Sequence, residues 1–220
     1  MRRHELEHVL RAAKGITDEI EFVVIGSQAI LAQIPDPPRL LTYSNEVDFY
    51  PLHAPEKADL IDGVIGELSR FHETYGYYAH GVAPETATLA LKWRERAVTL
   101  ETPLMEGAIG LCLHPVDVAY SKLAAGREKD FAFIRELIRC ELIKAGTLAG
   151  LCAFLFADLS AQELPNFFTS MMSSRQGETR KCQRARPPVP THFMRVLESN
   201  PSVNRTPVVN RCKAWTVTQH

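Results

Sequence analysis

The sequence lacks the segments that identify membrane-spanning, secreted and cysteine-stabilised proteins. No uncharged apolar run in the 220 residues approaches the 18 that a membrane-spanning helix needs. The opening MRRHELEHVLRAAK has two arginines but no continuous apolar stretch after them, so we expect no signal peptide and a cytoplasmic location. The five cysteines are widely spaced and none forms C-x-x-C, which argues against a disulfide framework or a zinc ribbon.

Several nucleotide-binding and hydrolase motifs are also missing. No G-x-G-x-x-G follows a predicted strand, and G-x-x-x-x-G-K-[ST] does not occur, so the sequence does not support a dinucleotide site or a P-loop. The absence of G-x-S-x-G removes the usual support for Ser27 as a hydrolase nucleophile. His72, His80 and His114 are isolated, and we expect each of them to be structural or exposed.

Charge is distributed unevenly along the chain. Residues 171–220 contain nine lysines and arginines, two acidic residues, five prolines and no sustained periodicity, so we expect most of this segment to be poorly ordered. A solvated tail, an unselected sequence such as the product of a shifted reading frame, and a basic nucleic-acid arm are three open interpretations of it. Acidic residues outnumber basic ones in residues 1–170, which gives no reason to expect tight binding to a nucleic-acid backbone there.

Hydrophobic patterning predicts one mixed α/β domain over residues 1–165, followed by an irregular basic tail over 166–220. Strands are predicted at 21–26, 46–51, 75–82, 96–102 and 109–113. Helices are predicted around 6–13, at 27–33, from Pro55, and in three segments after Pro115. The helix from Pro55 is expected to bury an apolar stripe of Leu60, Ile61, Val64, Ile65 and Leu68. The fold class that follows is α/β (α+β): a small mixed sheet flanked by helices, with a C-terminal helical region.

An acidic pair and a glycine–serine turn are the features that most suggest chemistry. Glu46 and Asp48 alternate with Val47 on the predicted strand and share a face with Tyr50, so their Cα atoms lie about 6.5–7 Å apart. Two carboxylates at that separation can share a hard cation such as Mg²⁺. The turn at 26–27 lets backbone N–H groups and a hydroxyl approach a phosphate. Both features also have an explanation without function. Two acids fall on one face of a half-exposed strand by chance, and the turn at 26–27 is then an ordinary turn.

Four pieces of the sequence resemble bacterial nucleotidyltransferase-like proteins. GSQAIL, VDFYP, GYYAHGV-PETATL and AGREKD occur in this order within residues 1–150. The resemblance is to the polymerase-β-type superfamily, and within it to relatives of the abortive-infection nucleotidyltransferase toxins of toxin–antitoxin systems. It implies a nucleotidyltransferase-like fold, and an enzyme that uses Mg²⁺ or Mn²⁺ to transfer a nucleoside monophosphate from an NTP to a protein or RNA hydroxyl. It also implies a cognate antitoxin protein as a partner.

The resemblance assigns roles to individual residues. The expected catalytic residues are Glu46, Asp48, Lys122 and Asp130, the first two being the metal-binding pair. The expected nucleotide-binding residues are Gly26, Ser27, Lys122, Arg127 and Lys129. Chemistry agrees with these roles, because a lysine offers phosphate a point charge and an arginine offers a planar fork. A helix N-terminus with solvated charges explains residues 127–130 equally well.

Two departures from the resembled pattern keep a second interpretation open. Better-known members of the superfamily have Asp-x-Asp where this chain has Glu46 first, and a third strand-borne acid is not evident. Glu101 is the best candidate for a third metal ligand and Glu85 is the second. If no third acid takes part, the chain is a catalytically degenerate nucleotide- or partner-binding module of the same fold. A truncated or frame-altered relative that no longer folds stably is a further alternative.

Overall fold

A five-stranded mixed sheet forms the centre of the protein, as predicted. The computed structural model describes residues 1–152; the predicted tail and the end of the last predicted helix lie outside these residues. The strands are β1 (Glu21–Val24), β2 (Glu46–Pro51), β3 (Tyr78–Gly81), β4 (Val98–Leu100) and β5 (Ile109–Cys112). Their order across the sheet is β3-β2-β1-β5-β4, and each lies within or closely matches a segment that alternation or an apolar run predicts.

Strand direction brings two segments far apart in the sequence side by side. β1 pairs antiparallel with β2 and parallel with β5, while β4 pairs antiparallel with β5. β2 pairs parallel with β3, which requires a crossover between them. In that register Glu46 lies opposite Tyr78 and Asp48 lies opposite His80.

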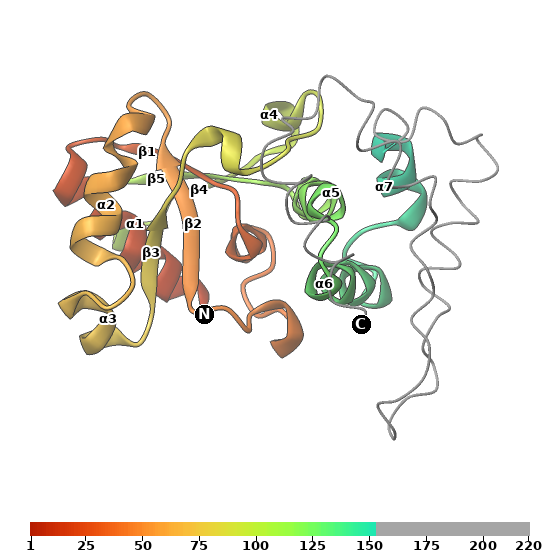
Figure 1. Ribbon diagram of the computed structural model, residues 1–220, viewed down its shortest axis with the longest axis horizontal. Coiled ribbons are helices and arrows are strands. Elements are labelled where there is room, and N and C mark those ends of the chain that lie inside the picture. The colour runs from red at the N-terminus through yellow and green to blue at the C-terminus, as the bar shows by residue number, and fades with distance from the viewer. Residues whose placement is uncertain (153–220) are drawn as a thin grey trace, which may run out of the picture.

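Helices flank the sheet on both sides (Figure 1). Seven α-helices are described: α1 (Arg3–Thr17), α2 (Ala58–Ile65), α3 (Arg70–Tyr75), α4 (Trp93–Arg96), α5 (Pro115–Ala125), α6 (Glu128–Arg139) and α7 (Ala145–Cys152). Five 3₁₀ helices join them: η1 (Ser27–Ala32), η2 (Arg39–Leu41), η3 (Pro55–Lys57), η4 (Pro84–Thr86) and η5 (Pro103–Met105). α1, α2 and α3 lie to one side of the molecule, and α5, α6 and α7 form the C-terminal helical region on the other (Figure 1).

The face of the sheet that carries the apolar residues of β2 packs against the first helices. Val47 and Phe49 are fully buried, and the Phe49 ring meets Phe22 edge to face at 5.7 Å. α2 lies so close to β3 that a Cβ on Gly81 would stand 2.0 Å from the backbone oxygen of Ala58. Because side chains alternate along a strand, Glu46 and Asp48 point to the opposite face, where η1 contacts β2 and α5.

The predicted apolar stripe of α2 is wrong in three of its five positions. Ile61 and Ile65 are buried, but Leu60, Val64 and Leu68 are 53%, 54% and 82% exposed. α2 is apolar on more than one face, and only the face that carries Ile61 and Ile65 packs against the sheet. Leu68 lies beyond the end of the helix, which stops at Ile65.

Two other local predictions also need correction, and two short helices, α3 and α4, were not predicted. The predicted helix at 27–33 is the 3₁₀ helix η1. Tyr50 was expected on the open face with the acidic pair but is only 5% exposed, and burial raises its pKa. In the described part of the chain, no helix has the length and apolarity to cross a membrane.

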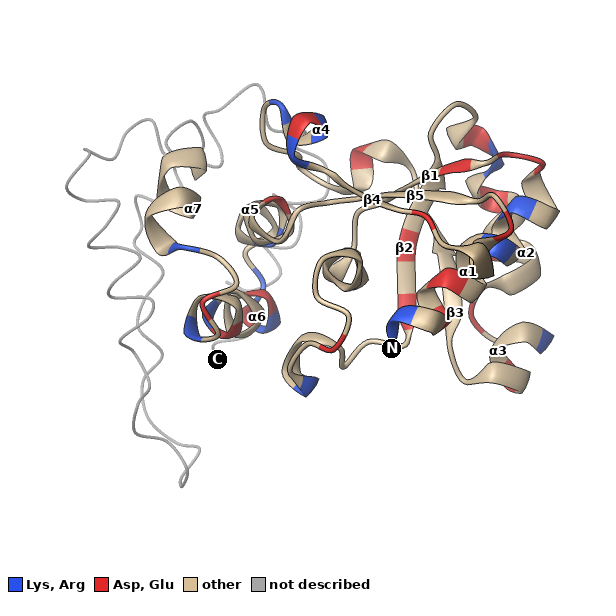
Figure 2. Cartoon of the chain, turned by 180° about the vertical axis from the view of Figure 1, so that it is seen from behind, with Lys and Arg blue, Asp and Glu red and all other residues tan. Residues whose placement is uncertain are grey.

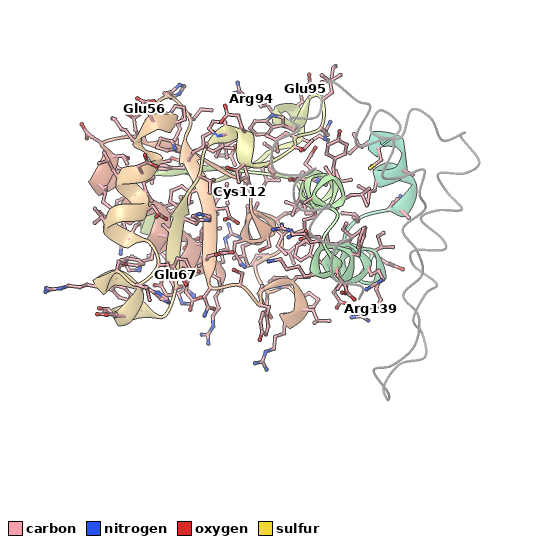
Figure 3. All side chains as sticks on the ribbon, viewed as in Figure 1. Glu56, Glu67, Arg94, Glu95, Cys112 and Arg139 are labelled. Carbon is pink, nitrogen blue, oxygen red and sulfur yellow. The ribbon has the colours of Figure 1, made fainter. Side chains whose placement is uncertain are left out.

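The interior is apolar up to the start of the C-terminal helices. Figure 3 shows Cys112, at the end of β5, among the side chains between the sheet and α5. Burial raises the pKa of this thiol to about 12, so it stays protonated and packs as a small apolar group. Arg94 and Glu95 of α4 lie at the edge of the molecule (Figure 3).

Candidate functional site

Two carboxylates of β2 are each held by a side chain of β3. The hydroxyl of Tyr78 donates to Glu46 Oε2 at 3.1 Å, and Nδ1 of His80 lies 2.9 Å from Asp48 Oδ1. Both contacts follow from the parallel register, which sets each partner directly opposite its carboxylate. Two acids, a phenol and an imidazole therefore form one polar strip across the two strands; the acidic residues of β2 are red in Figure 2.

The turn after β1 brings the backbone against the second carboxylate. The amides of Ile25 and Gly26 donate to the backbone oxygen of Asp48 at 3.0 and 3.4 Å. A Cβ on Gly26 would lie 2.1 Å from Asp48 Oδ2, well inside van der Waals contact. Only glycine fits this approach without moving the carboxylate. The structure thus brings together Gly26 and Asp48, which the sequence placed in two separate motifs.

The environment sets the protonation of the two β3 residues. Burial and the charge of Glu46, together with their hydrogen bond, raise the pKa of Tyr78 to about 12. Tyr78 therefore remains a donor at neutral pH. The hydrogen bond to Asp48 raises the pKa of His80, although partial burial acts in the opposite direction. The half-exposed imidazole of His80 is thus held at the Asp48 carboxylate by a hydrogen bond and by charge.

Ser27 and Gln28 follow Gly26 at the start of η1. The six-residue 3₁₀ helix is too short to supply the helix dipole that a phosphate would meet at a longer α-helix. The Gln28 side chain is fully buried, and its Nε2 donates to Ser44 O at 3.1 Å. Its Oε1 has no hydrogen-bond partner among residues 1–152. A buried acceptor without a donor is costly to the stability of the fold.

A second charged cluster joins α5 to α6. Asp130 is completely buried and accepts from Lys122 Nζ at 3.0 Å and from Arg127 Nε at 2.5 Å. The Lys122 ammonium also lies 4.8 Å from the centre of the Phe133 ring. Two cations share one carboxylate, so the cluster has an excess positive charge at Lys122 and Arg127. Asp130 orients both cations and does not itself face solvent.

The local structure explains the spacing of this second cluster. Gly126 ends α5 in the left-handed conformation, with φ +66°, and Arg127 is the N-cap residue of α6. The break between the helices lets Arg127 and Lys122 meet the first turn of α6. Lys129, which the resemblance assigned to nucleotide binding, is exposed and takes no part in the contacts to Asp130.

The two clusters lie on elements linked through the long segment between β1 and β2. η1 contacts both β2 and α5, and η2 contacts α6. The acidic strip and the basic cluster are therefore separated by η1 and η2, and no direct contact joins Lys122 to Glu46 or Asp48 among the ion pairs of residues 1–152.

Neither proposed third acid joins the carboxylate pair. Glu101 follows β4, three strand positions from β2, and the register sets it level with the far end of β2. Glu85 is an exposed residue of η4. Within residues 1–152, no three histidine, cysteine, aspartate or glutamate side chains gather closely enough to hold a metal ion. Glu101 therefore does not join Glu46 and Asp48 as a third ligand.

The two carboxylates nevertheless fit a hydrated divalent cation. Mg²⁺ keeps several waters and commonly binds through one or two carboxylates plus substrate phosphates. Glu46 and Asp48 are half-buried carboxylates beside a glycine turn, which suits an ion that arrives with a triphosphate. They do not form a complete protein cage.

One further pattern in the sequence is explained by packing. α1 contains H-E-x-x-H at residues 4–8, a spacing found in zinc peptidases. Nδ1 of His8 lies 2.8 Å from the Tyr77 hydroxyl, and its ring packs against Phe71 and Tyr75. No third ligand stands beside this pair in the described chain. His8 is therefore part of an aromatic cluster between α1 and α3.

A comparison with protein families decides the identity of this fold. Residues 4–165 match the model of a family described as "Nucleotidyltransferase of unknown function (DUF6036)". The chain belongs to this family. Searches of curated proteins and of solved structures gave no significant match.

Membership gives the two clusters a common chemical context. A nucleotidyltransferase binds a nucleoside triphosphate, and enzymes of this kind generally act with divalent metal ions. The matched segment includes both β2 with its acidic pair and the Lys122–Asp130 cluster. Bacterial origin and a toxin role, which the resemblance also implied, remain predictions.

The sequence analysis missed the two β3 residues of this candidate site. His80 looked isolated, and Tyr78 was not singled out. The available signal was the alternation of Tyr78, Ala79 and His80, which puts the phenol and the imidazole on one face. That local alternation does not predict the parallel register that sets them opposite Glu46 and Asp48.

Proposed function

We propose that the protein transfers a nucleoside monophosphate from an NTP to a hydroxyl of a protein or RNA acceptor. The acceptor oxygen bonds to the α-phosphorus, and the bond from that phosphorus to the bridging oxygen of the β-phosphate breaks. Pyrophosphate leaves, and the proton of the acceptor hydroxyl passes to solvent. Membership in the nucleotidyltransferase family supports the reaction class; the acceptor class rests on the resemblance.

The residues beside β2 have distinct parts in this proposal. Glu46 and Asp48 hold a divalent cation, Mg²⁺ or Mn²⁺, which supplies positive charge to the phosphate oxygens and activates oxygen nucleophiles. Tyr78 and His80 fix the two carboxylates. Gly26 and Ser27 offer the phosphates backbone amides and a hydroxyl next to Asp48.

The cluster of α5 and α6 serves the phosphates in a different way. Lys122 and Arg127 carry excess positive charge that would stabilise the charge developing during transfer. Asp130 is a positioning residue, since it is fully buried and bonded to both cations. Lys129 is exposed, and its proposed part is longer-range attraction of the nucleotide.

One observation carries the proposal: two half-exposed carboxylates share a sheet face with a glycine turn that touches one of them. The test is transfer of label from α-³²P-labelled NTPs to a lysate of protein and RNA, with Mg²⁺ or Mn²⁺ added. Asp48→Asn and Glu46→Gln should abolish labelling while leaving thermal unfolding close to wild type. Asp59→Asn, an exposed acid on α2, is the matched control. Equal labelling by wild type and Asp48→Asn would remove the acidic pair from the reaction.

A binding module of the same fold is the second candidate, and the metal-ligand count favours it. No third acidic or histidine ligand joins Glu46 and Asp48 among residues 1–152. Calorimetry with each NTP, with and without Mg²⁺, separates the candidates. Binding of an NTP without turnover in the labelling assay supports the module, whereas pyrophosphate release supports the enzyme.

We further propose that the protein acts in a bacterial cytoplasm as the toxin of a toxin–antitoxin pair. The support is the resemblance of residues 1–150 to abortive-infection nucleotidyltransferases. Induced expression in a bacterial host should arrest growth, and Asp48→Asn should relieve the arrest. Equal arrest by both proteins would contradict a toxic activity at this site.

A further inference from the structure

His80 lies where a nitrogen ligand of the proposed cation would stand. Its Nδ1 is 2.9 Å from Asp48 Oδ1. In an octahedral site with metal–ligand bonds of about 2.1 Å, two adjacent ligand atoms lie about 3 Å apart. The length of this hydrogen bond matches the spacing of neighbouring ligands of one ion; to bind an ion together with Oδ1, the imidazole would turn its Nδ1 lone pair from Oδ1 toward the ion. A cation that enters takes the place of the proton that now joins them.

The pair is also accessible, unlike other strongly paired acids of the chain. The side chains of Asp48 and His80 are 27% and 49% exposed. Asp117 and Asp130 are completely buried, and each is bound to an arginine. A hydrated cation carried by a triphosphate can reach Asp48, whereas the other two carboxylates are enclosed and already neutralised.

We propose that Asp48 and His80 are an oxygen ligand and a nitrogen ligand of the same cation, and that His80 makes the site prefer Mn²⁺ to Mg²⁺. This inference rests on the proposed function for the nature of the site. Imidazole suits transition metals, whereas Mg²⁺ prefers oxygen ligands. Phosphate oxygens and water complete the coordination. Glu46, bonded to Tyr78, lies two residues away on the same face and adds negative charge.

The same chain contains a matched histidine–carboxylate pair that lacks these surroundings. His53 Nε2 lies 2.7 Å from Glu21 Oε2, with side-chain exposures of 66% and 37%. No glycine turn meets this pair as Gly26 meets Asp48. A His53→Asn variant therefore controls for nonspecific binding of metal to an exposed histidine.

The test is electron paramagnetic resonance of Mn²⁺ added with inorganic tripolyphosphate to the full chain. Pulsed measurements should detect coupling of Mn²⁺ to the ¹⁴N of an imidazole in wild type and in His53→Asn. The coupling should disappear in His80→Asp and in Asp48→Asn. Competition by Mg²⁺ should require at least tenfold higher concentration in wild type, and His80→Asp should reduce that ratio. Thermal unfolding identifies any variant that fails to fold.

Each outcome decides the inference. Mn²⁺ bound in an Asp48-dependent way without ¹⁴N coupling would show that His80 only hydrogen-bonds to Asp48, and would overturn the proposal. No Asp48-dependent binding of Mn²⁺ would overturn it as well. The result is separable from the proposed function. Imidazole coupling in a protein that transfers no nucleotide supports His80 as a metal ligand and contradicts the proposed enzymatic function. Nucleotide transfer without imidazole coupling supports the enzymatic function and contradicts His80 as a metal ligand.

Discussion

Replacement of Gly26 by alanine should damage the candidate site and leave the fold in place. The new Cβ would lie 2.1 Å from Asp48 Oδ2, whereas ordinary contact begins at 3.4 Å. The carboxylate must therefore move by about 1.3 Å, the difference between these distances. A displacement of about 1 Å in a reacting group can cost about 100-fold in rate. We expect Gly26→Ala to lose about two orders of magnitude in nucleotidyl transfer.

The cost in stability should be modest for two reasons. Gly26 has φ −78° and ψ −173°, an extended conformation that alanine adopts without strain. The crowded atom belongs to a half-exposed carboxylate that can rotate away. We expect a loss of about 1–2 kcal/mol in the free energy of unfolding, toward the lower end of the range for overpacking.

Gly63→Ala is the matched control, since it makes the same chemical change in α2. A Cβ there meets nothing within 4 Å. Alanine should stabilise the helix by about 0.5–1 kcal/mol and leave transfer unchanged. The assay is initial rate with α-labelled NTP, together with urea unfolding of both variants. Wild-type transfer by Gly26→Ala would show that the position of the Asp48 carboxylate does not limit the reaction, and would refute the reasoning.

Three further predictions concern the stability of the fold that carries the site. Arg96 binds the fully buried Asp117 through two nitrogens at 2.9 and 2.6 Å, so Arg96→Ala should lower the free energy of unfolding by about 3–5 kcal/mol in urea; a loss below 1 kcal/mol would contradict this. Ile61→Ala should cost about 2–4 kcal/mol and Leu60→Ala less than about 0.5, because only Ile61 is buried; similar costs would show that α2 packs in another orientation. His114 caps α5 by accepting a backbone N–H at 3.2 Å, and burial lowers its pKa below 6.5. The cap's contribution is thus present above pH 6.5 and lost as the pH falls through 6.5 toward the folded pKa. His114→Asn, which accepts without titrating, should flatten the dependence of the urea midpoint on pH between 8 and 5, and an unchanged slope would argue against the cap.

Alternation predicted the strands well because it reports a local property of the chain. In β2, Val47 and Phe49 are buried while Glu46 and Asp48 stay half-exposed, as the period of two requires. Tyr50 broke the pattern, since its burial depends on neighbouring segments that strand periodicity does not describe.

Helical periodicity was less informative where a helix is short or apolar on several sides. α2 carries apolar residues on more than one face, so the sequence could not tell that Ile61 faces the sheet and Leu60 does not. η1 spans only six residues, too few for spacing to separate a 3₁₀ helix from an α-helix. α3, with the sequence RFHETY, has no apolar period that could reveal it.

The candidate site divides in the same way between local and long-range information. Glu46, Asp48 and the glycine turn were visible as motifs because each lies within a few consecutive residues. Their partners Tyr78 and His80 follow thirty-two residues after Glu46 and Asp48. Their alignment depends on how α2 and α3 carry the chain from β2 back to a parallel strand. A crossover of different length would shift β3 by one residue and turn both side chains to the other face.

The ion pairs of the described residues distinguish the acidic pair of β2 from the enclosed acids of the domain. Asp117 and Asp130 are enclosed, and each is neutralised by a guanidinium that cannot lose its proton. Asp48 is open to solvent and is paired with a histidine, whose charge is conditional. Glu46 is paired with an uncharged phenol. A cation at Asp48 and Glu46 would therefore not have to displace an arginine or a lysine. The basic cluster at Lys122 and Arg127 offers the complementary charge for an anion. A metal–triphosphate complex would meet both requirements in one ligand, and we propose that the domain binds a nucleotide in this way.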